Sequence, residues 1–213
     1  MDTQSVQKEG QLMEHVELGI GVFQYEFPEE LAKNLVEVAR QLGDEKWFKS
    51  GVGVDNDAHQ EVRTSRGLSL AETFPFWNDE VRKYTTPALN DYTAKMDVEI
   101  TQDEGFNMLR YGVSNKYDFH TDANWTNYRT VSALVYLNPS EYEGGETFFK
   151  YFDLKVKPEK PSIVVFPSNY AYLHAALPVT EGEKIVLVTW CNDMPAGYPP
   201  TVLHNLGRLV GKF

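Results

Sequence analysis

The sequence predicts a mainly β protein of the α+β class, in which helices near the N-terminus precede an antiparallel sandwich or barrel. From about residue 98 onward, short runs rich in β-branched and aromatic residues are separated by turn-forming residues, as in sandwiches and barrels. Before that point, apolar residues recur at helical spacing instead. The 213 residues are 42% hydrophobic, which is enough for one domain with a sizeable core.

Two segments in the first half predict helices. The stretch FPEELAKNLVEVARQLG has Pro28 near its first turn, acidic residues at the positive end of the helix dipole, and Gly43 as a stop. Its apolar residues form one stripe: Leu31, Leu35, Val38, Ala39 and Leu42. Residues 74–96 predict one or two further helices, interrupted at Pro87. Residues 51–67, rich in Gly, Asp and Asn, predict a loop followed by a short strand.

The second half predicts a series of short strands. They cover residues 98–102, 106–112, 117–122, 130–138, 145–152, 154–158, 162–168, 171–177 and 184–191. Turn-forming segments separate them, among them GVSN, EYEGG, PEKP and TEGE. We therefore expect helical support and a loop region over residues 1–97, a β core over residues 98–193 and a C-terminal arm over residues 194–213, all within a single domain.

Composition disfavours several classes of protein. The net charge of −11 repels phosphate backbones, so we expect no nucleic-acid partner. No run of about 18 apolar residues is present, so we expect no membrane span, and the polar, acidic start lacks the pattern of a signal peptide. The lone cysteine, Cys191, excludes an internal disulfide and fits a reducing compartment, which predicts a cytoplasmic protein.

The segment KYDFHTD, residues 116–122, contains the first candidate metal ligands. In an extended strand, His120 and Asp122 project from the same face, although this spacing also arises by chance in surface pairs. The best candidate for a third ligand is His174, because a closed β core brings distant strands together. Two histidines and one carboxylate leave coordination positions open and favour Fe(II) used with oxygen and a co-substrate. With one cysteine, a cysteine-rich zinc site is excluded.

Other acidic and histidine residues fit a metal site less well. Asp118 has the same strand parity as His120, but one strand cannot easily direct three successive same-face residues at one ion. His59 follows Asp55 and Asp57, yet this stretch lacks the glycine and the distal glutamate of a calcium-binding loop. We interpret it as a solvated loop.

Several motifs in the same order resemble the Fe(II)/2-oxoglutarate-dependent oxygenases, and specifically prolyl 4-hydroxylases, over roughly residues 60–192. The central motif is His-x-Asp, a distal histidine and a basic residue ten positions later, here His120, Asp122, His174 and Lys184. Further similar segments are VRTSRG, RYGVSNKYDFHTD, RTVSALVYLN, EGGETFF and LHAALPVTEGEKIVLVTW. Single matches of this kind are weak, but six in the correct order are strong.

This resemblance implies a fold, cofactors and an activity. The fold would be a double-stranded β-helix, or jelly-roll, core supported by N-terminal helices. Fe(II), 2-oxoglutarate and O2 would be required, with ascorbate as reductant. 2-Oxoglutarate would be decarboxylated to succinate and CO2 while an unactivated C–H bond is hydroxylated. The partner would be a proline-containing peptide or protein.

The resemblance also implies residue roles. His120, Asp122 and His174 would be the catalytic iron ligands. Lys184, expected on the strand next to that of His174, would bind the 5-carboxylate of 2-oxoglutarate, because a buried lysine needs an anionic partner. Tyr136 would add a hydrogen bond to that carboxylate, and Tyr111 would also reach the cofactor.

Two residues, Arg129 and Trp190, match positions that line the peptide pocket in the family and would contact the substrate. Arg63 would lie in a mobile substrate loop over the site, because Gly51, Gly53 and the Asp-rich surroundings predict flexibility. Glu146 and Thr147 would support the barrel. Two alternatives stay open: an oxygenase with the same cofactors that acts on another side chain or a small molecule, and a catalytically inactive jelly-roll binding module.

Overall fold

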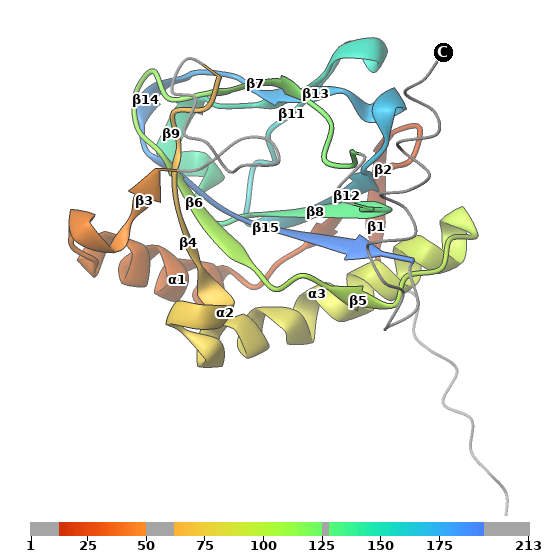
Figure 1. Cartoon of the computed structure of the whole chain (residues 1–213), viewed down its shortest axis with the longest axis horizontal. Helices are drawn as coiled ribbons and strands as arrows, with labels where there is room; N and C mark the ends of the chain where they lie inside the picture. Colours follow the sequence, from red (N-terminus) through yellow and green to blue (C-terminus); the bar gives the residue numbers. More distant parts are fainter. Residues whose placement is uncertain (1–12, 50–61, 125–127, 194–213) are drawn as a thin grey trace, which may run out of the picture.

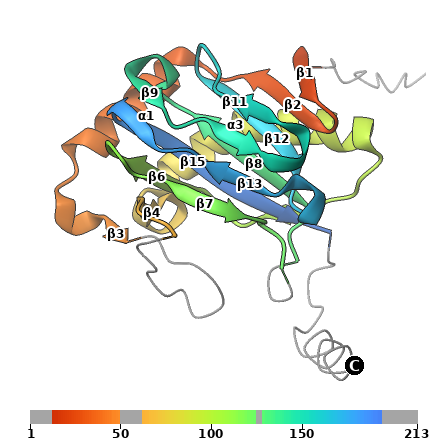
Figure 2. The same ribbon diagram turned by 90° about the horizontal axis from the view of Figure 1, so that it is seen from above.

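The chain forms three layers: helices, a large antiparallel sheet and a smaller antiparallel sheet (Figure 1). The computed structural model describes residues 13–49, 62–124 and 128–193. Seen from above, the strands of the small sheet lie over the central strands of the large sheet, and the helices lie behind it (Figure 2). The mainly β prediction is therefore confirmed.

The large sheet combines strands from both halves of the chain. Its order is β1 (His15–Gly19), β2 (Val22–Glu26), β12 (Ser162–Pro167), β8 (Val131–Tyr136), β15 (Lys184–Asn192), β6 (Asn107–Tyr111), β4 (Arg66–Ser69) and β3 (Phe48–Lys49), with β5 (Gln102–Asp103) paired to β15. The small sheet has the order β11 (Leu154–Val156), β10 (Thr147–Phe149), β13 (His174–Ala176) and β7 (Tyr117–His120). A separate pair joins β14 (Val179–Gly182) to β9 (Tyr142–Gly144).

Strand β15 shows how the sequence positions both faces of the large sheet. Side chains alternate between the two faces of a strand, and both faces of this sheet are covered, so the strand is apolar almost throughout. One set of its residues packs toward the helices: Ile185, Leu187 and Cys191. The alternate set lines a cavity between the sheets: Lys184, Val186, Val188 and Trp190.

The helices cover the outer face of the large sheet. They are α1 (Glu29–Gln41), α2 (Leu70–Thr73) and α3 (Pro75–Met96), and 3-10 turns cover Asp44–Lys46, Pro139–Glu141, Lys150–Phe152 and Tyr170–Tyr172. The predicted helix around residues 28–43 is confirmed as α1, whose first turn carries two acidic residues. Its buried residues enter the main core: Ala32, Leu35, Val36 and Ala39.

The prediction that Pro87 interrupts a helix was wrong, because α3 continues through it. A proline inside a helix has no N–H to bond the carbonyl four residues earlier, which here belongs to Lys83. Both Pro87 and Lys83 are exposed, so water can satisfy that carbonyl. The opposite face of the helix is buried in the core through Val81, Leu89 and Tyr92, and this burial outweighs the cost of the proline.

Replacing Pro87 by alanine is expected to stabilise the fold. The change restores one backbone hydrogen bond and removes a helix-interior cost of about 3 kcal/mol, partly offset by the greater freedom of alanine in the unfolded chain. We expect the free energy of unfolding, measured with urea, to rise by about 1–3 kcal/mol. Thr86→Ala, at the adjacent exposed position, is the matched control. A loss of stability in Pro87→Ala would contradict this account of α3.

Some strands were not expected from the sequence. The hairpin β1–β2 lies in the region predicted as helical support, and its second strand joins the large sheet through β12. The segments EYEGG and TEGE, predicted as turns, contribute to the paired strands β9 and β14. Glycine explains this pairing: Gly144 and Gly182 have positive φ, and a Cβ would come within 2.4 Å of Pro178 O and 2.3 Å of Glu141 O, respectively.

Other predicted strands are shorter than expected. Residues 98–102 contribute only the start of β5, and the run over residues 145–152 leaves its strand after Phe149 to form a 3-10 turn. None of the helices in the described part of the chain has the length and apolar character that crossing a bilayer requires. The predictions for His59, for most of the loop over residues 51–67 and for the arm over residues 194–213 concern residues outside the described ranges.

Candidate active site

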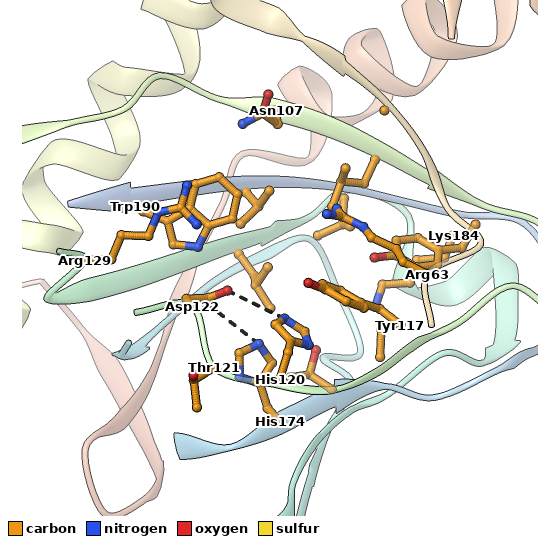
Figure 3. Close-up of a pocket in the computed structure, with 18 of the residues that line it drawn as sticks. Arg63, Asn107, Tyr117, His120, Thr121, Asp122, Arg129, His174, Lys184 and Trp190 are labelled. Carbon is orange, nitrogen blue, oxygen red and sulfur yellow. Dashed lines mark ion pairs between the residues drawn. The ribbon is translucent and has the colours of Figure 1, made fainter. Parts of the chain in front are cut away.

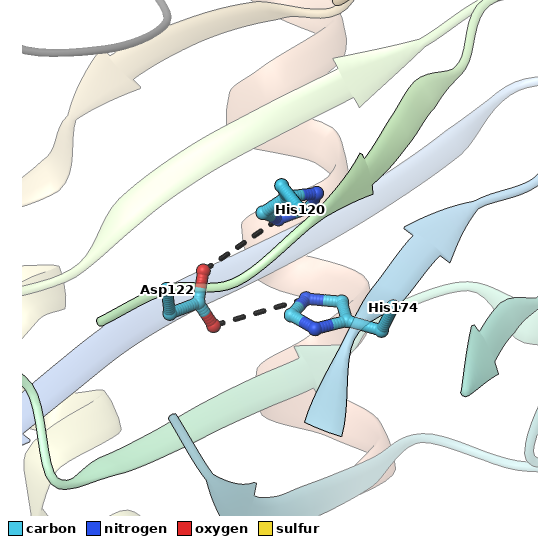
Figure 4. A group of neighbouring side chains, drawn as sticks. All are labelled: His120, Asp122 and His174. Atoms are coloured by element: carbon cyan, nitrogen blue, oxygen red, sulfur yellow. Dashed lines mark ion pairs between the residues drawn. The ribbon is translucent and has the colours of Figure 1, made fainter. Parts of the chain in front are cut away.

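Two distant strands of the small sheet bring His120 and His174 together. Strand β7 ends at His120 and β13 begins at His174, and the antiparallel register places these two residues directly opposite each other. Cross-strand partners project from the same face of a sheet, so both rings point into the cavity. Asp122 lies just past the end of β7 and faces both imidazoles (Figure 4).

The three side chains form a compact donor set. Nε2 of His120 lies 3.6 Å from Asp122 Oδ1, and Nε2 of His174 lies 3.8 Å from Asp122 Oδ2. All three offer a ligand atom within 4.8 Å of the others. Each imidazole is anchored by its other nitrogen, because Nδ1 lies 2.8 Å from Asp118 O in His120 and 2.9 Å from Tyr172 O in His174. A carbonyl only accepts, so Nδ1 donates and Nε2 presents its lone pair.

Electrostatics favour the ligand forms of these groups. Burial, together with the charge of His120, lowers the pKa of His174 to about 4, so its imidazole is neutral at neutral pH. Burial alone would raise the pKa of Asp122, but the two histidines and a hydrogen bond from Ser132 hold it well below its usual range. The site therefore presents a neutral imidazole and a carboxylate, as metal binding requires.

These residues fit a divalent metal with open coordination positions. Nε2 of each histidine and one Asp122 oxygen would hold the ion from one side, and the remaining positions would face the cavity. This donor set is typical of non-haem Fe(II) oxygenases. Asp118, which we excluded as a ligand, instead pairs with Lys116 at 2.7 Å.

Lys184 lies in the wall of the same cavity, which has a volume of about 320 Å³. The expectation that it lies on the strand next to His174 was wrong: β15 belongs to the large sheet, across the cavity from β13. Lys184 is 2% exposed, and its ammonium donates to Gly145 O at 2.7 Å and makes no ion pair among the described residues. Burial lowers the pKa of Lys184 to about 7.

The rings of two tyrosines lie near Lys184, and one of these tyrosines is held by a threonine. Its Nζ lies 5.4 Å from the ring centre of Tyr111 and 5.0 Å from that of Tyr136. Tyr111 lines the cavity, whereas the hydroxyl of Tyr136 is engaged by Thr147 at 2.6 Å. Thr147, which the sequence predicted to support the barrel, lines the cavity, whereas Tyr136 does not. A direct hydrogen bond from Tyr136 to a cofactor stays a prediction.

Tyr117 is a site residue that strand alternation conceals. It lies three positions before His120, so in a regular strand the two side chains would point to opposite faces. A register irregularity in the β7–β13 pairing places them on the same side, and their rings stack with centres 3.5 Å apart. Tyr117 lines the cavity and covers one face of the His120 imidazole.

Arg63 covers the outer side of Tyr117. Its guanidinium lies 4.5 Å from the centre of the Tyr117 ring, and the backbones of the two residues form an isolated bridge. The segment around Arg63 is thus paired to the small sheet, and a few residues later the chain enters β4 in the large sheet. This crossing brings Arg63 to one side of the cavity.

Arg129 and Trp190 lie on the other side of the cavity (Figure 3). The Arg129 guanidinium stacks over the indole at 3.5 Å and donates to both carboxylate oxygens of Glu104, at 2.9 and 2.7 Å. Glu104 therefore fixes Arg129 as a flat cover on Trp190. No sequence motif singled out Glu104, because its role depends on a contact with a residue 25 positions away in the sequence.

Comparison with known proteins agrees with this geometry. The model of the 2OG-Fe(II) oxygenase superfamily matches residues 106–192, which contain all three candidate ligands and Lys184. Probable prolyl 4-hydroxylase 9 of Arabidopsis thaliana is 38% identical over 119 residues, covering 42% of this chain and 41% of its own. A PKHD-type hydroxylase of Alteromonas mediterranea is 35% identical over 96 residues, covering 40% of this chain and 42% of its own. These matches span about two fifths of the length of either relative.

The fold is shared with a solved prolyl hydroxylase. A Trichoplax adhaerens prolyl hydroxylase in complex with a hypoxia inducible factor peptide fragment superposes with a TM-score of 0.67 at 18% identity, covering 81% of this chain and 84% of that one. The family match supplies the cofactors Fe(II), 2-oxoglutarate and O2, which the donor set and the buried lysine fit. Residues 106–192, which contain the candidate site, are therefore similar to the 2OG-Fe(II) oxygenase superfamily.

Proposed function

We propose that this protein is an Fe(II)- and 2-oxoglutarate-dependent dioxygenase that hydroxylates proline in a peptide or protein. The observation that carries the proposal is one cavity with a His-Asp-His donor set on the small sheet and a buried lysine on the large sheet. A buried ammonium is costly without an anion. 2-Oxoglutarate supplies a carboxylate for the lysine and chelating oxygens for the metal.

In this proposal each group has a defined task. His120, Asp122 and His174 hold Fe(II), which, when bound, couples oxygen reduction and 2-oxoglutarate decarboxylation to C–H hydroxylation. Lys184 binds the distal carboxylate and fixes the orientation of the co-substrate. Tyr111 packs beside it and helps to exclude water.

The proline substrate is supported by the cavity walls and by the relatives. Trp190 with Arg129 on one side, and Tyr117 with Arg63 on the other, provide aromatic and planar surfaces between which a proline ring would fit (Figure 3). Relatives are named as prolyl 4-hydroxylases, and the Trichoplax structure holds a peptide. We also propose that the two facing sheets form the double-stranded β-helix. Ascorbate as reductant and a cytoplasmic location stay predictions from the sequence.

A second candidate keeps the cofactors but changes the substrate. The Alteromonas relative is named a PKHD-type hydroxylase, a name that does not specify proline. An oxygenase acting on another side chain or a small molecule would use the same metal site and the same lysine. The inactive binding module, in contrast, would bind neither iron nor 2-oxoglutarate productively.

Two experiments in sequence test the proposal. Anaerobic addition of Fe(II) and 2-oxoglutarate should produce a visible charge-transfer band, and its absence would favour the binding module. A panel of proline peptides is then incubated with oxygen, and we expect release of succinate together with a +16 Da product. Each peptide is matched by a control with alanine in place of proline. A charge-transfer band without any proline product would favour the second candidate.

The affinity for 2-oxoglutarate should fall as the pH rises from 6 to 8. The free Lys184 ammonium has a pKa of about 7, and a bound carboxylate raises it, so binding takes up a proton above pH 7. The dissociation constant should therefore rise by up to about tenfold per pH unit above 7. Titration of the charge-transfer band at each pH measures it. Lys184→Arg should bind with little pH dependence over this range, because a guanidinium stays charged; equal slopes in both proteins would contradict the prediction.

A further inference from the structure

A chain of two buried serines reaches the carboxylate of Asp122 from the large sheet. Ser132 Oγ lies 2.6 Å from Asp122 Oδ2, and the Oγ atoms of Ser132 and Ser168 lie 2.7 Å apart. The two serines are 0% and 1% exposed. The hydroxyl chain therefore ends on the Asp122 carboxylate, which forms the metal donor set together with the imidazoles of His120 and His174.

The direction of the hydrogen bonds along this chain follows from the number of protons. A serine hydroxyl has one proton to donate, and an ionised carboxylate only accepts. Ser132 therefore donates to Asp122 and accepts the proton of Ser168. Hydrogen bonds to ionised groups are roughly twice as strong as neutral ones. In this buried position the contact from Ser132 holds the carboxylate firmly.

The backbone places both serines without help from their hydroxyls. Ser132 lies on β8, where it pairs with Phe166 on β12 and Trp190 on β15. Ser168 follows β12, and its carbonyl accepts from Ala123 N at 2.9 Å, next to Asp122. Asp122 itself lies beyond the end of its strand, where no sheet ladder fixes it. Side-chain and backbone bonds from the large sheet thus replace the missing ladder.

We propose that Ser132, oriented by Ser168, is a positioning residue that fixes the rotation of the Asp122 carboxylate and thereby sets the metal affinity. The inference rests on the proposed function, because the metal of that site is the ion that Asp122 binds. Asp122 Oδ1 faces His120 Nε2 and Oδ2 faces His174 Nε2. Rotation of the carboxylate would break this arrangement, and Ser132 opposes that rotation through Oδ2.

A matched pair of substitutions separates the hydroxyl from its volume. Threonine and valine have nearly the same shape and differ by a hydroxyl in place of a methyl group. Ser132→Thr keeps the donor to Asp122, whereas Ser132→Val removes it. Ser168→Ala keeps the Ser132 donor but removes the group that orients it. Thermal unfolding by circular dichroism checks that every variant is folded.

The measurement is the dissociation constant for Co(II), an oxygen-stable probe, titrated into metal-free protein without 2-oxoglutarate and followed by its visible absorption. We expect Ser132→Val to bind about 10- to 100-fold more weakly than Ser132→Thr. Ser132→Thr should remain close to the wild-type protein, and Ser168→Ala should lie between the two. This readout does not depend on turnover.

Each outcome decides for or against the positioning role. Equal Co(II) affinity in the valine and threonine variants, whether both are normal or both weakened, would overturn it, because the hydroxyl would then be irrelevant. A wild-type protein that does not bind Co(II) would overturn it together with the proposed function. If the expected ranking appears but no succinate forms with any substrate, the positioning role stands and the proposed reaction fails.

Discussion

Replacing His174 by alanine is expected to abolish turnover and to weaken metal binding strongly. The loss of metal affinity should exceed the roughly 10- to 100-fold that follows when a residue hydrogen-bonded to a metal ligand is removed. The substitution removes one of the three donor atoms, and the described residues near the cavity offer no other histidine or carboxylate to the cluster. The fold should survive. The lost bond from Nδ1 to Tyr172 O is worth about 0.5–1.5 kcal/mol, and an open catalytic metal contributes less to folding than a closed structural one.

Succinate release and Co(II) titration measure these effects, and thermal unfolding monitors the fold. His15→Ala is the matched control, because His15 lies on β1 at the edge of the large sheet and stacks on Phe23 instead of lining the cavity. The control should keep both turnover and Co(II) affinity. Full activity in His174→Ala would show that the third ligand lies elsewhere, and our assignment of the site would fail.

Lys184→Ala is expected to weaken 2-oxoglutarate binding by roughly 100- to 1000-fold and to change metal affinity little. The ammonium is buried and makes no ion pair among the described residues, so in the complex it is the natural partner of the distal carboxylate. Leaving that carboxylate desolvated and unpaired costs about 3–5 kcal/mol, or two to three decades in affinity. Lys184→Arg should be milder, because it keeps the charge on a longer, planar group.

The control for charge is Lys157→Ala, because Lys157 donates to Tyr142 O and does not line the cavity. Apparent 2-oxoglutarate constants are measured at saturating Fe(II). The structure also sets a ranking of hydroxyls: Thr147→Val should weaken binding more than Tyr136→Phe, because Thr147 lines the cavity and Tyr136 lies behind it. Small and equal effects from Lys184→Ala and Lys157→Ala would mean that the acid is held elsewhere.

Motif order in the sequence was sufficient to select the residues that meet in the cavity. His120, Asp122 and His174 lie together, and Lys184 and Trp190 line the same space. These positions were accessible because they depend on residue type and on separation along the chain. Alternation along one strand even places Lys184 and Trp190 on one face without any knowledge of the fold.

What the sequence did not reveal depends on how strands pair. Tyr117 stacks on His120 only because a register irregularity changes the strand parity, and the residue pattern of the strand gives no sign of that irregularity. Lys184 was expected beside His174 because the two are close in sequence, whereas antiparallel sheets return the chain to the opposite layer. Ser132 was recognised as part of a motif, but its contact with Asp122 requires two sheets to face each other.

Local sequence patterns were also insufficient to predict α3 and the hairpin β1–β2, because packing energy decides both. Pro87 has a strong local preference against helix interiors, yet the buried face of α3 outweighs it. The hairpin β1–β2 was missed because its alternation of polar and apolar residues is short and lies near a polar terminus. In both cases, long-range packing decides the outcome, and a local pattern cannot report it.

The length of β15 has a consequence for redesign. Lys184 and Trp190 are six residues apart on one face of this strand, a separation of about 20 Å at 3.3 Å per residue. Because one continuous, doubly covered strand carries both, the spacing between Lys184 and Trp190 in the cavity wall cannot be adjusted gradually. Inserting or deleting one residue would turn every following cavity residue toward the helices. Under the proposed function, redesign of substrate preference would therefore target lining residues outside this strand, such as Arg63, Tyr117 and Arg129, while the strand itself is kept at constant length.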